Sequence, residues 1–212
     1  MTDAPNFLDF LRPAPVIAIL RGLEPDVCYS AAGALARAGL RAVEVTMNTP
    51  GVADIIAELG RRFPDLAVGA GTVCTPAELE VALGAGAAFV VTPILDERVI
   101  AGCTERGIPV FPGAYTPTEI YRAWRLGATA VKVFPAGGLG VGYVKDLAGP
   151  LPQIPLVPTG GVSPENVADF LAAGAVAVGM GSSLLRRDLV AAADWAGLEA
   201  HARLVLNPRS AG

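Results

Sequence analysis

Short apolar runs recur along the chain and alternate with stretches in which apolar residues return every three or four positions. The runs, rich in β-branched residues, are 16–20, 42–46, 66–70, 89–92, 108–111, 130–134, 155–157 and 175–178. The stretches between them, such as 27–38 and 77–83, show helical periodicity. Strands that alternate with helices predict a parallel sheet of the α/β class, and eight such strands predict a (β/α)₈ TIM barrel.

Helix-boundary residues support this count. Prolines are expected just inside helix starts at Pro25, Pro50, Pro76, Pro117 and Pro164. The segments 75–78 and 116–119 carry the Thr-x-x-Glu pattern of a capping box. No linker or low-complexity segment divides the chain, so we predict one barrel domain over residues 1–212. A short N-terminal helix at 5–12 is expected to close the bottom of the barrel, and the last outer helix is expected after residue 186.

Composition narrows the class of protein. The chain has 212 residues, of which 52% are hydrophobic and 17% charged, and its net charge is −4. These values exclude a disordered chain and give no reason to expect a nucleic-acid partner. No apolar run approaches the roughly 18 residues of a membrane span, and residues 1–12 lack a signal-peptide pattern. We therefore predict a cytoplasmic protein with no membrane partner. The three cysteines have no metal or disulfide spacing, and no metal or cofactor is predicted.

Lys132 is the first candidate for chemistry. The chain has only two lysines, and Lys132 lies between Val131 and Val133 in an apolar strand. Because side chains alternate along a strand, the valines are expected to pack under the helices and the lysine to face the barrel interior. Burial lowers the pKa of a lysine, and a neutral amine is a nucleophile for ketones. The alternative is a lysine held by a buried carboxylate.

Glu44 repeats this pattern on the second strand, between Val43 and Val45. A glutamate and a lysine that face one interior near the carboxyl ends of strands predict an acid/base and nucleophile pair, because barrel active sites lie at that end. A buried ion pair that only fixes structure is the alternative. Lys145, on a helical pattern, is expected to be solvated.

Further candidates bind anions. Arg21 directly follows the first strand, where it can grip a carboxylate or form a rim salt bridge. Thr72 ends a Gly-Ala-Gly-Thr turn that permits close approach of a ligand. The loops 159–164 and 179–183 present glycine backbone at expected helix starts, which predicts a phosphate site, with ligand-free tight turns as the alternative. His201 is expected to be a surface or packing residue.

The segments 17–22, 43–46, 69–73, 131–135 and 158–161 resemble the 2-keto-3-deoxy-6-phosphogluconate (KDPG) and 6-phosphogalactonate aldolases. The resemblance implies that Lys132 forms an imine with a phosphorylated keto acid substrate and that Glu44 shuttles protons. It implies that Arg21 and Thr72 hold the pyruvate carboxylate. It also implies a homotrimer that needs no metal. The remaining implied contacts are Phe134 and Pro93 in the pyruvate pocket and Gly160, Gly161, Gly181 and Ser182 at the phosphate.

The chain departs from both branches of this family. Asn48 stands where the gluconate branch usually has arginine, and Arg21 resembles the galactonate branch, but Thr159 resembles the gluconate branch. The substrate is therefore the gluconate epimer, the galactonate epimer, or both at C4, and we expect both with a mild preference for the gluconate-derived one. Two alternative functions remain: a phosphosugar isomerase or synthase without covalent catalysis, and a catalytically silent phosphate-binding protein.

Overall fold

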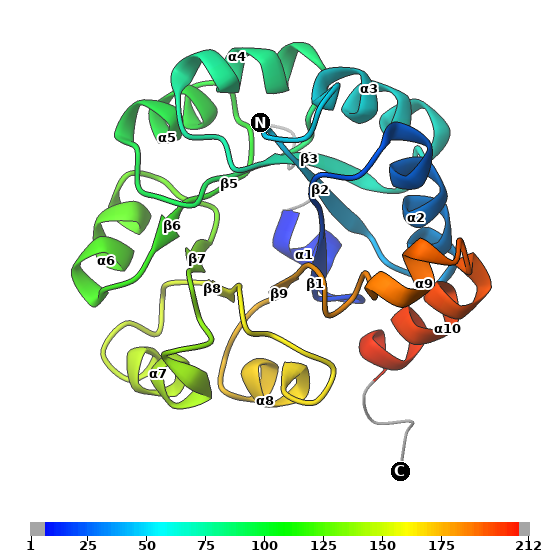
Figure 1. Cartoon of the computed structure of the whole chain (residues 1–212). Coiled ribbons are helices and arrows are strands. Elements are labelled where there is room, and N and C mark those ends of the chain that lie inside the picture. The colour runs from blue at the N-terminus through cyan, green and yellow to red at the C-terminus, as the bar shows by residue number, and fades with distance from the viewer. Residues whose placement is uncertain (1–6, 208–212) are drawn as a thin grey trace.

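The apolar runs form parallel strands that surround a common centre, with helices on their outer side (Figure 1). The structure is a computed structural model that describes residues 7–207. Its strands are β1 (Val16–Leu20), β2 (Ala42–Thr46), β3 (Ala67–Gly71), β4 (Val90–Val91), β5 (Val110–Phe111), β6 (Gly113–Ala114), β7 (Val131–Val133), β8 (Leu156–Pro158) and β9 (Val178–Met180). The predicted α/β class with parallel strands is confirmed.

Helices follow the strands as the periodicity predicted. They are α1 (Phe7–Leu11), α2 (Pro25–Arg37), α3 (Val52–Arg62), α4 (Pro76–Gly84), α5 (Glu97–Thr104), α6 (Pro117–Arg125), α7 (Gly140–Ala148), α8 (Val167–Ala172), α9 (Arg187–Ala191) and α10 (Trp195–Leu206). No helix within residues 7–207 combines the length and the apolar character needed to cross a bilayer.

The strands form two parallel sheets rather than the one continuous eight-stranded sheet of the prediction. One sheet has the order β5-β4-β3-β2-β1-β9 and the other β6-β7-β8. The break after β5 falls at Pro112, which has no N–H to donate, and the unpredicted strand β6 follows it. Separate contacts link the sheets: Thr129 N donates to Val110 O at 2.9 Å, and Thr159 forms a parallel bridge with Gly179.

Helix starts agree with the prediction at three prolines and differ at two. Pro25, Pro76 and Pro117 lie in the first turns of α2, α4 and α6. Pro50 lies outside α3, because Gly51 precedes that helix in a left-handed conformation, with φ of 70°. Pro164 lies in a turn before α8, where the Ser163 carbonyl accepts from Asn166 N and Val167 N.

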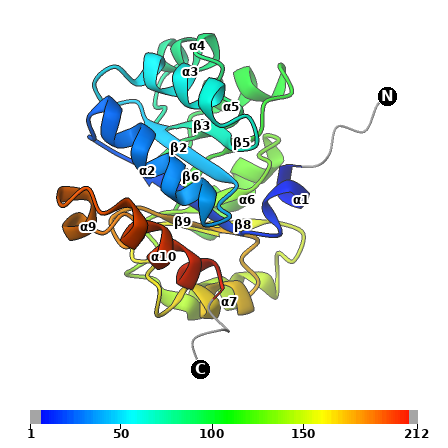
Figure 2. The ribbon, with the colours of Figure 1, turned by 90° about the vertical axis from the view of Figure 1, so that its right-hand side faces the viewer.

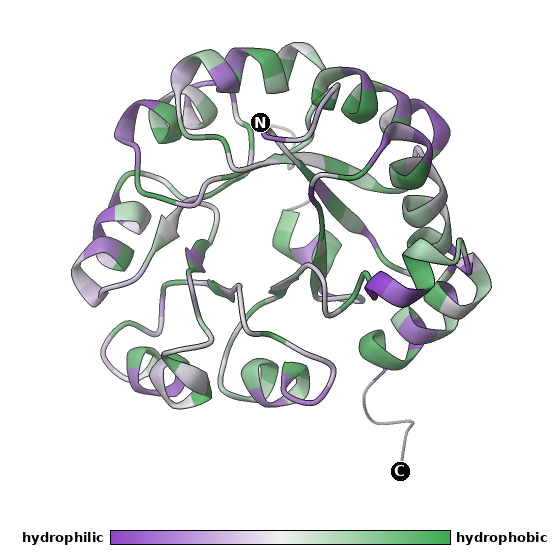
Figure 3. Ribbon diagram, viewed as in Figure 1, coloured by the Kyte–Doolittle hydropathy of each residue, from purple (hydrophilic) through white to green (hydrophobic). Residues whose placement is uncertain are grey.

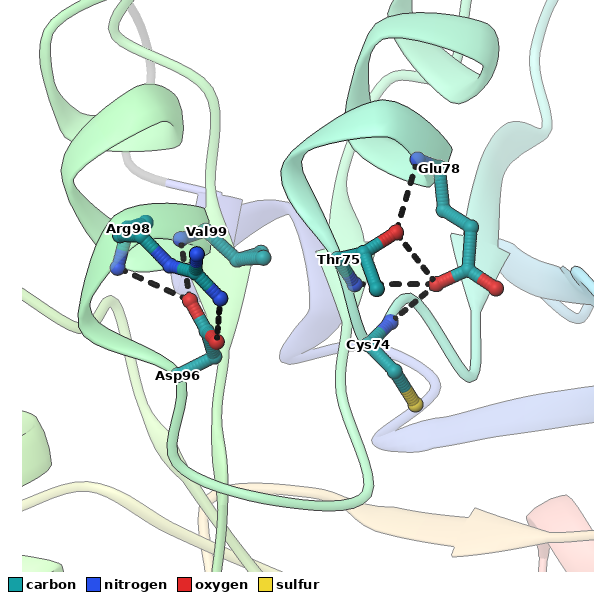
Figure 4. A network of polar contacts seen from close by, with 6 residues as sticks. All are labelled: Cys74, Thr75, Glu78, Asp96, Arg98 and Val99. Carbon is teal, nitrogen blue, oxygen red and sulfur yellow. Dashed lines mark hydrogen bonds and ion pairs between the residues drawn. The ribbon is translucent and has the colours of Figure 1, made fainter.

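Polar caps fix the helices that start beside the carboxyl ends of β3 and β4 (Figure 4). In the capping box of α4, Glu78 N donates to Thr75 Oγ1 at 3.2 Å, and Glu78 Oε2 accepts from Thr75 N at 3.0 Å. Asp96 caps α5 by accepting from the backbone N–H groups of Arg98 and Val99 at 3.0 and 3.1 Å. Both predicted capping boxes, the other at Thr116–Glu119, are confirmed.

Two apolar cores divide the interior. The larger lies between strands and helices, and the smaller is built from strand residues that alternate with those of the larger core, including Phe89 and Phe111. The α1 residue Phe7 closes this smaller core, with ring centroids 5.0 Å from Phe89 and 5.7 Å from Phe111. Figure 2 places α1 and α9 on opposite sides of the ring. The start expected for the first helix, at residues 5 and 6, lies outside the described residues.

The C-terminal segment differs from the single outer helix expected after residue 186. It forms two helices, α9 and α10, with the break at residues 192–194. Ala193 adopts a positive φ of 50°, which a helix cannot continue through. Asp194 then starts α10, because its side chain accepts from Gly197 N at 2.9 Å.

Candidate active site

Lys132 on β7 and Glu44 on β2 lie inside the ring of strands. Their neighbours Val131, Val133, Val43 and Val45 belong to the outer core beneath the helices, as the alternation predicted. Only 3% of Lys132 and 2% of Glu44 is exposed to solvent. Both residues line one small cavity of about 10 Å³ in the ring. The fold therefore holds an amine and a carboxyl group in the same enclosed space.

Burial moves the proton equilibria of this pair towards the neutral forms. Burial raises the pKa of the Glu44 carboxyl, while the positive charges of Lys132 and Arg21 act in the lowering direction. Burial lowers the pKa of the Lys132 ammonium, and the Glu44 charge opposes that shift. Within residues 7–207, Glu44 Oε1 is buried and has no hydrogen-bond partner. An unpaired buried polar atom is costly, so this oxygen is available to a ligand.

The end of β3 and the turn after it contact two residues of the site: Gly71 lies against Glu44, and Thr72 binds Arg21. A Cβ at Gly71 would lie 2.6 Å from Glu44 Oε1, so only glycine leaves room for the carboxylate. The next residue, Thr72, has a φ of 59°. This left-handed conformation is strained for a β-branched residue and costs about 1–3 kcal/mol. It places Thr72 Oγ1 where it accepts a hydrogen bond from Arg21 Nη2 at 3.1 Å.

A larger pocket of about 600 Å³ brings together most of the predicted site. Its walls include Arg21, Lys132, Phe134, Thr159, Gly160, Gly161, Gly181 and Ser182. Lys132 Nζ lies 4.8 Å from the centre of the Phe134 ring, so an apolar ring flanks the amine. Thr159 and Lys132 line both the pocket and the small cavity. With Ile19 and Gly179, which also line both, the small cavity that holds Glu44 shares four wall residues with the pocket.

Three predicted residues do not line the larger pocket: Glu44, which lines the small cavity, Thr72 and Pro93. Thr72 reaches it only through its hydrogen bond to Arg21. Pro93 instead packs against β6, where a Cβ at Gly113 would lie 2.3 Å from the Pro93 carbonyl carbon. Gly113 pairs with Lys132 across β6 and β7, so Pro93 lies next to the lysine strand, and its place in the pyruvate pocket stays a prediction.

The two glycine loops at one end of this pocket are turns rather than direct helix starts. Helices α8 and α9 begin only at Val167 and Arg187, several residues after the glycines, which corrects the prediction. Gly160 and Gly161 have φ values of 80° and 79°, which favour glycine. Among the described residues, the backbone N–H groups of Gly161 and Ser182 have no protein acceptor. Such free groups can bind an anion.

Side chains brace these loops against each other. Ser183 Oγ donates to Val162 O at 2.7 Å and joins the two loops directly. Asn166 Nδ2 donates to Gly161 O at 3.0 Å within the first loop. His201 Nε2 lies 2.9 Å from Ser183 O, so a residue expected only at the surface or in packing holds the second loop from α10. No local sequence signal marks this role, since it depends on how α10 packs.

Arg187, which no sequence pattern marked as a site residue, lines the pocket together with residues of the second loop. Together with Arg21 it gives the pocket two guanidinium groups. Lys145, in contrast, is exposed on α7, as predicted. The arrangement suits a substrate with two anionic groups and a carbonyl that meets the buried amine.

Comparison with known proteins gives a consistent result. The family model described as "KDPG and KHG aldolase" matches residues 8–201. The 2-dehydro-3-deoxy-6-phosphogalactonate aldolase of Escherichia coli strain K12 is 39% identical over 174 residues, covering 81% of this chain and 85% of that protein. The 2-dehydro-3-deoxy-phosphogluconate aldolase of Pseudomonas aeruginosa is 39% identical over 196 residues, covering 92% and 88%.

A solved structure shares the fold. The KDPG aldolase from Legionella pneumophila, with pyruvate captured at low pH as a covalent carbinolamine intermediate, superimposes with a TM-score of 0.87 at 28% identity. The match covers 94% of this chain and 97% of that one. Because the family model matches residues 8–201 of the 212 in this chain, the chain belongs to the KDPG and KHG aldolase family.

Proposed function

We propose that this protein is a class I aldolase that acts on 2-keto-3-deoxy-6-phospho sugar acids. It cleaves them reversibly to pyruvate and glyceraldehyde 3-phosphate through a Schiff base on Lys132. The observation that carries the proposal is the buried amine beside a buried carboxylate that has an unpartnered oxygen, next to a cationic pocket. The covalent carbinolamine captured in the Legionella relative supports the same chemistry.

Binding places the two ends of the substrate in different parts of the pocket. Arg21, held by Thr72, takes the C1 carboxylate, because a guanidinium matches a carboxylate with two parallel donors. The phosphate takes the free N–H groups of the braced loops at Gly161 and Ser182. The C2 ketone then lies at Lys132 Nζ, against the Phe134 ring.

The reaction begins with attack of the neutral Lys132 amine on C2. Proton transfer through Glu44 releases the C2 oxygen as water and leaves a protonated imine, which draws electrons from the neighbouring bonds. Glu44 removes the proton of the C4 hydroxyl, the C3–C4 bond breaks, and glyceraldehyde 3-phosphate leaves. Glu44 then returns a proton to C3 of the enamine, and water releases pyruvate and the free amine. A carboxyl with a raised pKa suits these repeated transfers in both directions.

We infer that the two sheets act together as one closed (β/α)₈ barrel in a single domain. The backbone bond from Thr129 to Val110 and the bridge from Thr159 to Gly179 support this closure. We also propose a homotrimer, on family membership alone. Light scattering should then give a mass about three times the 21.6 kDa of one chain. Because a charged sugar phosphate does not cross membranes unaided, we place the enzyme in the cytoplasm with its substrate.

For the C4 centre we propose that both epimers are cleaved, with a mild preference for the gluconate-derived one. Thr159 lies in the pocket wall beside Lys132. Its hydroxyl donates to Val157 O at 3.3 Å, so the hydroxyl oxygen remains free to accept from a C4 hydroxyl in one configuration. Asn48 is exposed and lies outside the pocket wall, so it supplies no charge there.

Borohydride reduction in the presence of pyruvate tests the proposal against its two alternatives. A Schiff-base aldolase gains the mass of one reduced pyruvate on Lys132, and Lys132→Ala abolishes both labelling and cleavage. Lys145→Ala is the matched control, since it removes the other lysine of the chain and should leave both unchanged. An isomerase or synthase without covalent catalysis, or a silent phosphate-binding protein, gains no mass. Labelling at Lys145 would overturn the assignment of the nucleophile.

A further inference from the structure

Arg187 stands out among the cations of the pocket because it has no partner. It is the first residue of α9 and lines the pocket beside Ser182 and Ser183. Its neighbour Arg186 pairs with Asp188, with Nε 3.1 Å from the carboxylate. Arg187 itself makes no ion pair or side-chain hydrogen bond within residues 7–207. Its guanidinium is thus uncommitted at the mouth of a site that already collects anion-binding groups.

The position of α9 places this charge at one end of the pocket. Figure 1 shows the chain running from β9 past β1 to α9, and Figure 3 shows a strongly hydrophilic stretch at the end of α9 nearer the strands. Lys132 and Phe134 form another part of the same pocket wall. Arg187 lines this pocket together with Ser182, the residue whose free N–H was assigned to the phosphate.

The phosphate of the substrate carries more negative charge than the backbone N–H groups of the glycine loops can balance. A phosphate ester carries about −1.5 to −2 charges near pH 7. The glycine loops offer N–H groups but no full positive charge, and Arg21 is committed to the carboxylate end through Thr72. A guanidinium binds phosphate with parallel donors, so the uncommitted Arg187 has the geometry and the charge to complete the site.

We propose that Arg187 binds the terminal phosphate and makes the enzyme select phosphorylated aldehydes over unphosphorylated ones. This inference rests on the proposed aldolase function and names the residue that gives it this selectivity. Arg187 is exposed, so solvent screens its charge, and we expect an effect of about tenfold rather than several orders of magnitude. The effect should shrink as the salt concentration rises.

The test compares Arg187→Gln with Arg125→Gln in the condensation of pyruvate with glyceraldehyde 3-phosphate or with glyceraldehyde. Arg125 is the matched control because it is also exposed and without an ion pair among the described residues, yet lies on α6 outside the pocket. Arg186 does not serve, because its loss would free Asp188 to pair with Arg187. Arg187→Gln should lower kcat/KM for the phosphorylated aldehyde about tenfold and leave kcat/KM for glyceraldehyde within twofold. Arg125→Gln should change neither.

Two measurements separate this inference from the proposed function. Borohydride labelling with pyruvate alone should be equal in wild type and Arg187→Gln, and its absence in wild type would refute the aldolase instead. Calorimetric titration of glycerol 3-phosphate needs no turnover and should show weaker binding to Arg187→Gln than to Arg125→Gln. Equal binding to the two variants, or an equal loss with both aldehydes, would overturn the role of Arg187.

Discussion

Replacement of Lys132 by methionine tests the electrostatics of the buried pair. Methionine keeps much of the apolar stem but removes the amine, so Glu44 loses the neighbouring charge that most strongly lowers its pKa. Removing one partner from a buried pair typically costs about 3–5 kcal/mol. Because Arg21 remains and the carboxyl can take up a proton, we expect the lower end, about 3 kcal/mol at pH 8. For a chain of this length that lowers Tm by about 6–12 °C.

The pH dependence follows from both residues. A carboxyl whose folded pKa lies above its unfolded value binds more protons in the folded state, so its stability contribution falls as pH rises through that window. In Lys132→Met the pKa of Glu44 rises further, so the range of pH over which its contribution to stability falls becomes wider. A lysine with a lowered folded pKa does the opposite, so the contribution of Lys132 to wild-type stability rises with pH, and the variant lacks this contribution. The variant should therefore be much closer to wild type at pH 5 than at pH 8.

Urea unfolding at several pH values between 5 and 8 measures this difference. The double variant Glu44→Gln with Lys132→Met has neither charge, so its stability should lack the pH slope of the single variant. It should also be more stable than Lys132→Met at pH 8. If Lys132→Met loses the same free energy of unfolding at pH 5 and at pH 8, the loss comes from packing and the electrostatic reasoning is wrong.

Four further substitutions probe separate parts of the site. Glu44→Gln should slow turnover by about two to four orders of magnitude, and normal exchange of pyruvate methyl protons into D₂O would assign proton transfer to another group. Gly71→Ala should cut kcat about a hundredfold with little change in Tm, because the new Cβ displaces the Glu44 carboxylate. Its control Gly69→Ala meets the Phe89 ring at 2.6 Å and should instead lower stability by about 1–3 kcal/mol; the reverse pattern would contradict both assignments. Thr159→Val should shift the kcat/KM ratio of the C4 epimers less than tenfold towards the galactonate-derived one, since a neutral hydrogen bond contributes about 1 kcal/mol; a wild-type preference above about a thousandfold needs roughly 4 kcal/mol and would refute a single contact. His201→Leu should raise KM for glyceraldehyde 3-phosphate severalfold at unchanged KM for pyruvate, and His201→Gln should restore it; failure of the rescue would leave His201 a packing residue.

The alternation of side chains made Lys132 and Glu44 predictable. Each is a polar residue between two valines in a short apolar strand, and the strand geometry alone sends it to the opposite face from its neighbours. The capping boxes were also predictable, because all their bonds lie within four residues. Local patterns with local consequences are what a single sequence determines best.

The features that escaped prediction depend on contacts between distant segments or on exact backbone angles. His201 lies 18 residues from the serine that it holds. The break between the sheets falls at Pro112, directly after the predicted strand at 108–111, and the short strand β6 that follows was not predicted. Pro50 lies outside a helix because Gly51 takes a left-handed conformation that the sequence permits but does not require. None of these leaves a periodic signal in the chain.

The two ends of the ring divide stability from chemistry. On the side closed by α1, the rings of Phe7, Phe89 and Phe111 pack on one another in an apolar cluster. Towards the carboxyl ends, the molecule keeps an unpaired carboxylate oxygen on Glu44 and a strained backbone at Thr72. Such features lower the stability of a folded chain, and they persist where the surrounding structure holds them in place. These costly features gather at one end of the ring, beside a lysine whose ammonium form is disfavoured by burial. A bound keto acid that pairs with the polar groups during the reaction explains why they gather there.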